Sequence, residues 1–280
     1  MAIIVNTNMS SLKTQRNLTN ATNSLNTALE RMSTGLKINR AADDAAGMFV
    51  ANNLETQIRG SKIAQSNVAT GINVLQTVEG NLDVINENLL RIRDLCVQGA
   101  NGVYDAKSYT AMKNEIDARL AEITRISASA DFNGKKLLDG TITTDLTLQV
   151  GANGTTNDRI AVTKDVFAKA DAATLVGSAT ATFASTADAT ALLAKVDTAI
   201  SNVAARKATI GATENRLTSA QDSLVTTIEN ATAAKSTIVD ADIAEESANY
   251  TKAQILQQTS ATLLVQANQL PSMALTLVRQ

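Results

Sequence analysis

Apolar residues recur at helical spacing through the amino-terminal third of the chain. A first row steps by seven, four, three and four positions, which places its members on one face of an amphipathic helix. A second row keeps a heptad rhythm until Gly99 and the pair Asn101-Gly102 interrupt it. The first row is Leu18, Leu25, Leu29, Met32 and Leu36, and the second is Val68, Leu75, Val78, Leu82, Ile85, Leu89, Ile92 and Cys96.

The rest of the chain continues this helical pattern on both sides of residues 131–185. A helix is predicted from about Ser108, a suitable N-cap, with apolar positions from Tyr109 to Ile123. A longer one is predicted over residues 193–238, where apolar positions recur about every three and a half residues without proline. The final segment places leucine at strict heptad spacing, at Leu256, Leu263, Leu270 and Leu277.

Residues 131–185 follow a different pattern. The pairs Asn133-Gly134 and Asn153-Gly154 are turn formers, and apolar residues alternate at Leu146, Leu148 and Val150. This stretch predicts a β-hairpin region with too little apolar content for a large domain of its own. The expected fold class is therefore mostly α: a long coiled-coil rod with a small β-hairpin region at its outer tip.

The predicted helices at the two ends carry few charges. From Ile255 to Gln280 the only charged side chain is Arg279, and from Met1 to Leu12 there is none. A helix that faces water usually fills its polar face with Lys, Glu and Arg, whereas Gln, Asn, Ser and Thr can be buried when they find hydrogen-bond partners. Both ends therefore favour burial against other subunits over packing within one chain.

Composition argues against several classes of function. The chain of 280 residues has a net charge of −2, which gives no field to attract nucleic acid, and no stretch is long and apolar enough for a membrane span. It has no His and one Cys, so catalytic, metal and cofactor sites are not expected. The adjacent Asp43 and Asp44 point apart on a helix and are interpreted as a helix start, and Cys96 as an inert apolar residue. The first residues lack the basic and apolar regions of a cleaved signal peptide.

Several segments resemble, in order and spacing, the signature segments of the bacterial flagellins. The amino end reads AIIVNTNMSSL and then LERMSTGLKINRAADDAAGM, and Gly71-Ile72 follows. The middle reads LLRIRDLCVQGANG and DFNGKKLLDG, and the chain closes on QANQLPSMALTLVRQ. Such a set of spaced matches is far more specific than one short motif. Only about fifty residues separate DFNGKKLLDG from the returning helix, so the chain resembles a short form without large variable outer domains.

The resemblance implies an organisation and a set of partners. Residues 1–44 and 240–280 would pair as an inner coiled-coil domain, and 45–239 would form a surrounding helical rod. The chain would polymerise with itself into an extracellular flagellar filament after type III export, with an export chaperone on the carboxy-terminal helix and with filament cap and hook-junction proteins as partners. The expected polymerisation seam is Leu18, Leu25, Leu29, Met32, Leu256, Leu263, Leu270 and Leu277.

The resemblance also implies recognition by an innate immune receptor, the vertebrate flagellin-recognising Toll-like receptor. Arg91, Leu95 and Glu115 match the positions that form its central contact patch in flagellins that it senses. The match is incomplete. Leu90, Asp94 and Cys96 stand where the family commonly has Gln, Glu and Ala.

Three other classes of protein remain as alternatives. A hook-filament junction protein shares similar ends, although the match of LLRIRDLCVQGANG favours flagellin. A non-flagellar coiled-coil scaffold would carry charged residues beside the seams at both ends, which this chain lacks. An inserted zinc peptidase would need pairs of His, and there are none.

Overall fold

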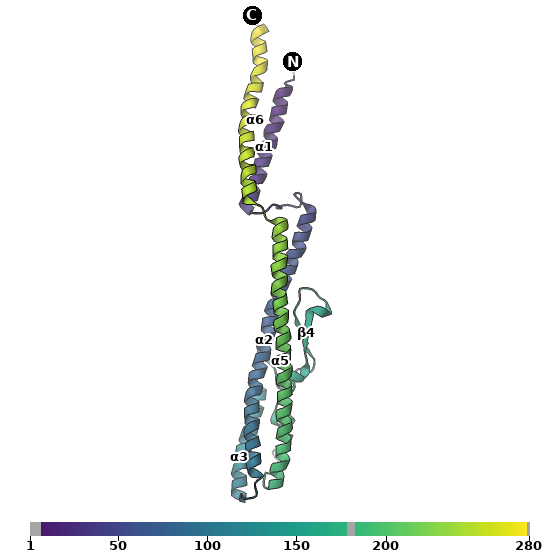
Figure 1. The fold of residues 1–280 in the computed structure, drawn as a ribbon, viewed down its shortest axis with the longest axis vertical. Helices are drawn as coiled ribbons and strands as arrows, with labels where there is room; N and C mark the ends of the chain where they lie inside the picture. Colours follow the sequence, from purple (N-terminus) through teal and green to yellow (C-terminus); the bar gives the residue numbers. More distant parts are fainter. Residues whose placement is uncertain (1–6, 178–182, 279–280) are drawn as a thin grey trace. The chain divides into compact units, whose positions relative to one another are not determined.

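The computed structural model describes residues 7–177 and 183–278, and side chains within these ranges up to residue 269. Six α-helices and four short strands follow one another along this part of the chain, with two short 3-10 turns between strands and helices (Figure 1). The elements are α1 (Met9–Thr34), α2 (Ala45–Gly99), α3 (Ala106–Ser129), β1 (Asp131–Phe132), β2 (Lys135–Lys136), β3 (Leu146–Gln149), β4 (Arg159–Val162), α4 (Ala172–Leu175), α5 (Thr186–Val239) and α6 (Ile243–Val278), with the 3-10 turns at Thr156–Asp158 and Lys164–Phe167.

The contacts divide the chain into two compact units. Unit 1 comprises Met1–Thr56 and Asn230–Gln280, and unit 2 comprises Gln57–Glu229. The division falls within α2 and α5, whereas the expected boundaries near residues 44 and 240 coincide with the connections that precede α2 and follow α5. The mostly helical fold with a small hairpin region is confirmed.

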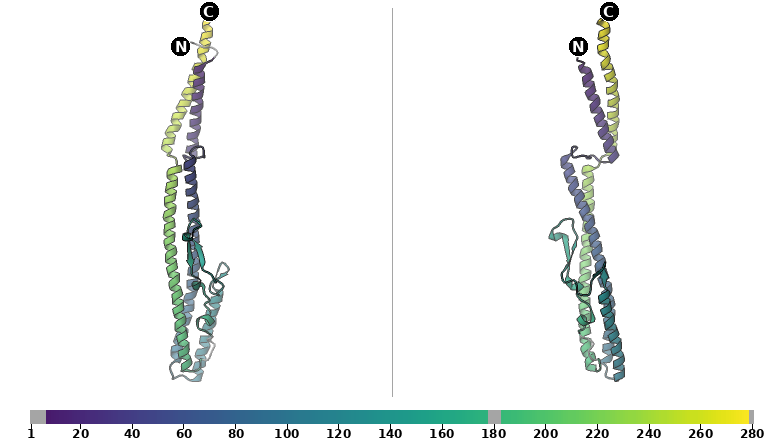
Figure 2. Two further views of the ribbon diagram at one scale, coloured as in Figure 1. Left: turned by 90° about the vertical axis from the view of Figure 1, so that its right-hand side faces the viewer. Right: turned by 180° about the vertical axis from the view of Figure 1, so that it is seen from behind.

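Unit 2 is a bundle in which α2, α3 and α5 run side by side (Figures 1 and 2). The heptad row predicted on α2 is its core, because every member from Val68 to Cys96 is fully buried. Large aliphatic side chains of α3 and α5 complete this core. The principal ones are Ile116, Leu120, Ile123, Val196, Val203, Ile210 and Leu217.

Helix α3 begins three residues earlier than the sequence pattern predicts. Its N-cap is Asp105, whose carboxylate accepts a hydrogen bond from the backbone N–H of Ser108 at 2.8 Å. The expected cap, Ser108, instead supplies that N–H and also donates its hydroxyl to the same carboxylate. Aspartate accepts the free amides of a first turn as well as serine does, so the preceding acidic residue takes the cap position.

Two antiparallel hairpins follow α3. The turn between β1 and β2 is Asn133-Gly134, with φ of 51° and 77°, as this residue pair predicts. Strands β3 and β4 pair in the register Leu146 to Val162. The second hairpin packs along the side of α2, where Ala152 lies against Gly60 and Leu148 against Gly71, and not at a tip. The two glycines explain this position, because any larger side chain there would overlap the hairpin.

In unit 1, a short backbone link joins the ends of two helices. Gly35, with φ of 71°, caps the C-terminus of α1, so Leu36 lies beyond the helix and not in its apolar row. Leu36 instead bridges to Asp240. The N–H of Lys37 donates to the carbonyl of Val239 at 2.6 Å, and the N–H of Ala241 donates to that of Gly35 at 2.9 Å.

Candidate functional site

Helices α1 and α6 of unit 1 pack against each other along a narrow strip in which half of the residues are small. On both helices the covered positions alternate in steps of three and four, which is the geometry of a coiled-coil seam. Only alanines and Glu246 reach full burial in this strip. On α1 the strip is Ser11, Thr14, Leu18, Ala21, Leu25, Ala28 and Met32, and on α6 it is Glu246, Tyr250, Ala253, Gln257, Ser260, Leu264 and Ala267.

The strip includes some of the predicted seam leucines and omits others. Leu18, Leu25 and Met32 are half-buried within it, but Leu29 is 54% exposed. Leu256 and Leu263 are 49% and 52% exposed, because the covered positions of α6 lie beside the leucine row and not on it. Leu270 and Leu277 lie outside the residues whose side chains are described.

The pattern that marks the strip is present in the sequence but inconspicuous. Ala253, Ser260 and Ala267 keep the same seven-residue spacing as the leucines, three positions before them. Small side chains let two helix backbones approach closely, and they contribute less apolar area than leucine does. A search for the largest apolar row therefore selects the leucines and misses the alanines.

Polar contacts tie α1 to α6 along the whole strip. Near the link, the guanidinium of Arg31 donates to the carboxylate of Glu246 at 3.0 Å. Farther along, the amide of Gln257 donates to the Thr22 hydroxyl at 3.1 Å. At the far end, the amide of Asn8 donates to the Ala267 carbonyl at 2.7 Å. The uncharged residues of both ends thus fix the pairing of the two helices.

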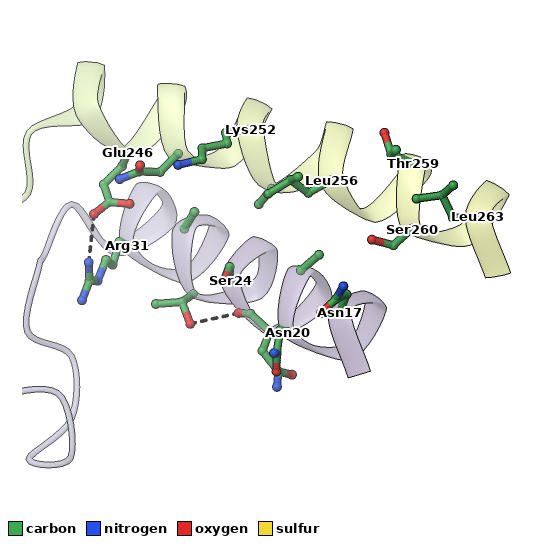
Figure 3. A pocket seen from close by; sticks show the side chains of 16 residues that line it. Asn17, Asn20, Ser24, Arg31, Glu246, Lys252, Leu256, Thr259, Ser260 and Leu263 are labelled. Carbon is green, nitrogen blue, oxygen red and sulfur yellow. Dashed lines mark hydrogen bonds and ion pairs between the residues drawn. The ribbon is translucent and has the colours of Figure 1, made fainter. Parts of the chain in front are cut away.

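A groove of about 820 Å³ runs along one side of this helix pair (Figure 3). Its α6 side carries Leu256 and Leu263, and its α1 side carries asparagines such as Asn17 and Asn20. Elsewhere on the pair, further apolar side chains are exposed to solvent. They are Met9, Leu12, Ile243, Ile255 and Val265.

The predicted receptor patch in unit 2 holds an exposed ion pair. The guanidinium of Arg91 on α2 donates to the carboxylate of Glu115 on α3 at 2.8 Å. This hydrogen bond raises the pKa of Arg91 and lowers the pKa of Glu115. The two residues are thus brought together on the surface.

Leu95 does not join that surface. Its side chain is 3% exposed and belongs to the core, so the expectation that it contacts a receptor directly is corrected. The physical reason is that α2 packs against both α3 and α5, which buries a wider arc than a two-helix seam does. The exposed apolar neighbour of Arg91 is Leu90, which is 43% exposed.

Cys96, Asp43 and Asp44 each make contacts that stabilise the fold. Cys96 is fully buried, and burial raises the pKa of its thiol to about 12, so the reactive thiolate is suppressed at neutral pH. The carboxylate of Asp44 accepts the N–H of Gly47 at 2.9 Å in the first turn of α2. That of Asp43 accepts the N–H groups of Asn39 and Arg40, which lower its pKa.

Neither a metal site nor a membrane span is found among the described residues. No group of three or more acidic, thiol or imidazole side chains in this part of the chain is placed to hold a metal ion. No helix within the same ranges is both long enough and apolar enough to cross a membrane.

Family models match both helical regions of the chain. The bacterial flagellin N-terminal helical region matches residues 5–143, and the C-terminal helical region matches residues 193–278. The chain belongs to the bacterial flagellin family. This flagellin is 37% identical to the flagellin of Bacillus subtilis, over 98% of this chain and 99% of that one. It is 35% identical to a 33 kDa flagellar filament core protein of Treponema phagedenis, over 99% and 100% of the two chains.

Solved structures are similar to parts of this flagellin. The crystal structure of Bacillus cereus flagellin matches with a TM-score of 0.49 and 29% identity, covering 57% of this chain and 88% of that one. A chain from Vibrio parahaemolyticus described as a flagellar hook-associated protein matches with a TM-score of 0.59. The sequence identity is 18%, over 70% of this chain and 99% of that one. A similarity at this level of identity indicates a shared fold only. This chain covers 99–100% of the length of the Bacillus subtilis and Treponema phagedenis relatives, which agrees with a short flagellin.

Proposed function

We propose that this flagellin polymerises with itself through the outer faces of α1 and α6 into an extracellular flagellar filament, as a structural subunit without catalysis. In that filament, residues 1–44 and 240–280 form the inner coiled-coil domain and 45–239 surround it. The observation that supports this is the incomplete burial of the terminal pair. The strip between α1 and α6 covers alanines and leaves Leu29, Leu256 and Leu263 exposed.

Exposed leucines on an uncharged helix favour association over solvation. Between Ala253 and Gln269 of α6 there is no charged residue. Hydration of the polar face therefore stabilises the solvent-exposed helix only weakly. Burying one leucine of an adjacent subunit against this row contributes about 1.5–3 kcal/mol. The polar residues along the groove can exchange hydrogen bonds with a neighbouring helix, as they do between α1 and α6.

The same exposed row requires protection before assembly. Apolar patches of this kind promote aggregation when no partner covers them. An export chaperone bound to α6 shields the row until the chain leaves the cell through the flagellar type III apparatus. The filament cap and the hook-junction proteins are the partners that receive it at the two ends of the filament.

Seeded growth tests this proposal. Short filament fragments are added to purified monomer, and the product is imaged by electron microscopy. Growth of long tubular filaments is the expected result. A hook-filament junction protein would form no more than a short collar on the seeds, and a non-flagellar scaffold would leave them unchanged, so either result would overturn the proposal.

A second function concerns the monomer and the surface around Arg91. The ion pair of Arg91 and Glu115 is exposed beside Leu90, and its charged groups are available to a receptor in aqueous surroundings. The vertebrate flagellin-recognising Toll-like receptor would contact this pair, with Leu95 supporting it from the core. Neighbouring subunits cover the same surface in the filament, so the free monomer is the active form.

A reporter-cell titration tests the receptor proposal. Replacing both residues, as Arg91→Ala with Glu115→Ala, should reduce the potency of the monomer at least tenfold, which corresponds to about 1.4 kcal/mol. The matched control replaces both members of another ion pair on the same bundle, Arg93 and Asp197, with alanine. Equal potency of the Arg91 variant and the unmodified monomer would contradict the proposal.

A further inference from the structure

Four charged residues meet where α2 and α5 pack together in unit 2. The ammonium of Lys207 on α5 forms an ion pair with the carboxylate of Asp83 on α2. Glu79 lies one turn before Asp83 on α2, and Glu214 lies two turns after Lys207 on α5. The charges of Asp83 and Glu79 both act on Lys207, and the charge of Glu79 also acts on Glu214.

Glu214 is half-buried and is the member of this group that carries a buried, unpaired oxygen atom. Its Oε1 atom is buried and makes no hydrogen bond with any described residue. The positions around it are part of the core, because Thr213 is 5% exposed and Ile210 and Leu217 are fully buried. A buried, unpaired carboxylate oxygen is costly when the group is charged and much less so when the group is neutral.

The antiparallel pairing of the helices places Glu79 next to Glu214. Because Lys207 lies opposite Asp83, positions further along α5 face positions earlier on α2, and Glu79 falls between Lys207 and Glu214. The charge of Glu79 acts on both of them. Arg216 lies two positions after Glu214, which turns it away on a helix.

We propose that Glu79 and Glu214 form a proton-sensitive contact between α2 and α5, which holds the bundle more firmly in mildly acidic than in alkaline surroundings. With one proton on Glu214 the buried oxygen is neutral and the two carboxyl groups can lie together. When that proton leaves, two negative charges face each other across the helix interface and the Oε1 atom of Glu214 remains buried. The net charge of this contact thus changes by one unit when Glu214 gains or loses its proton.

The direction of the effect follows from the titration of Glu214. Burial raises the pKa of this carboxyl above its ordinary value of 4.5, and the charge of Glu79 raises it further. The folded chain consequently retains this proton at a pH where the unfolded chain has lost it. This contribution to stability is fully present below 4.5 and is lost as the pH rises through the folded pKa.

The two other charges beside the contact, Asp83 on α2 and Lys207 on α5, form an ion pair with each other. The hydrogen bond to Asp83 raises the pKa of Lys207, and the charges of Asp83 and Glu79 raise it further. Among the described residues, no other charged group from α3 or the hairpins contributes to the pKa shift of Glu214. Lys207 pairs with Asp83 and does not contribute to the pKa shift of Glu214, so it does not offset the charge of that carboxylate.

Thermal unfolding of the unpolymerised full chain at a series of pH values tests this proposal. Glu214→Gln replaces the carboxyl by a neutral group of nearly the same shape. At pH 4.5 the variant and the unmodified chain should melt together, whereas at pH 8 the variant should melt higher by roughly 2–4 °C. Glu79→Gln should give the same trend at reduced size, because the Oε1 atom of Glu214 remains buried.

The matched control is Glu229→Gln, the same chemical change at an exposed position of α5. It should produce no gain that grows with pH. Carbon NMR of the Glu214 carboxyl gives a second readout that does not depend on variants, and its titration midpoint should lie above 4.5. A difference in melting temperature between Glu214→Gln and the unmodified chain that stays constant from pH 4.5 to pH 8 would overturn the proposal.

Discussion

In unit 2, helices pack through large aliphatic side chains, whereas in unit 1 the paired helices fully cover alanines and leave Leu29, Leu256 and Leu263 exposed. Leu82, Ile85 and Leu89 of unit 2 are fully buried, but Leu263 of unit 1 is 52% exposed. Both regions are long helices with heptad rows of comparable apolar content. The difference teaches that a heptad row indicates where a helix will be covered, but not whether its own chain supplies the cover.

The largest effect is expected from a charge on the exposed row. Leu263→Asp should abolish filament growth and leave unit 2 folded, because a carboxylate at a subunit contact loses its water without gaining a partner. Seeded growth measures the first effect, and circular dichroism measures the second. Leu263→Met, which keeps the apolar volume, should grow filaments. If the aspartate variant also grows normal filaments, the row of Leu256 and Leu263 does not face a neighbouring subunit.

A matched pair of truncations compares the two regions directly. Leu82→Ala should lower the free energy of unfolding by about 2–5 kcal/mol, since it opens a cavity in a closed core. Leu263→Ala should change it by no more than about 0.5 kcal/mol in the monomer, where this side chain already meets water. Chemical denaturation gives both values. Similar costs for the two truncations would show that the exposed leucine is packed in the monomer.

Hydrogen exchange should separate the two units along the backbone. The narrow strip between α1 and α6 buries little apolar area, so local opening there requires less free energy than opening in the unit 2 bundle. Amides of α1 and α6 should be protected at least about tenfold less than those around Leu82 in the monomer, or about 1.4 kcal/mol. Their protection should rise on assembly. Equal protection of both regions in the monomer would contradict this.

The smallest effect concerns the caps of two helices. The neutral amide of Asn8 caps α1 and accepts the N–H of Ser11, whereas the carboxylate of Asp105 caps α3. Hydrogen bonds from the hydroxyl and the N–H of Ser108 lower the pKa of Asp105 below 3.8. This cap is therefore intact above pH 3.8 and weakens as the pH falls through the lowered pKa.

NMR of the two capped amides measures this difference. Acidification should shift the Ser108 signal and leave the Ser11 signal unchanged. Asp105→Asn removes the titration but keeps an acceptor, so it should abolish the shift. A Ser108 signal that still moves with pH in that variant would assign the shift to another group.

The sequence predicts unit 2 better than it predicts unit 1. The row from Val68 to Cys96 is continuous, aliphatic and uninterrupted, so period and residue type both lead to the same buried face. The hairpin turn at Asn133-Gly134 is equally clear, because this pair tolerates positive φ. The position of the second hairpin depends on contacts at Gly60 and Gly71, which are distant from it in sequence and leave no mark in its own pattern.

The candidate surfaces were predicted in part, for reasons that differ between residues. Arg91 and Glu115 were expected to lie together, and they form an ion pair. Leu95 was expected in the same patch, and the packing of α2 against two helices buries it. The unpaired Glu214 could not be found from the sequence, because its surroundings are set by the offset between two helices.

The buried thiol of Cys96 has a practical consequence for labelling this protein. It is the only cysteine in the chain, and with a pKa of about 12 it reacts slowly with maleimides at neutral pH. A cysteine introduced at an exposed position, such as Val103→Cys, would therefore be the sole fast-reacting thiol without removal of the native one. A single fluorophore attached there would report the growth of individual fibres in real time.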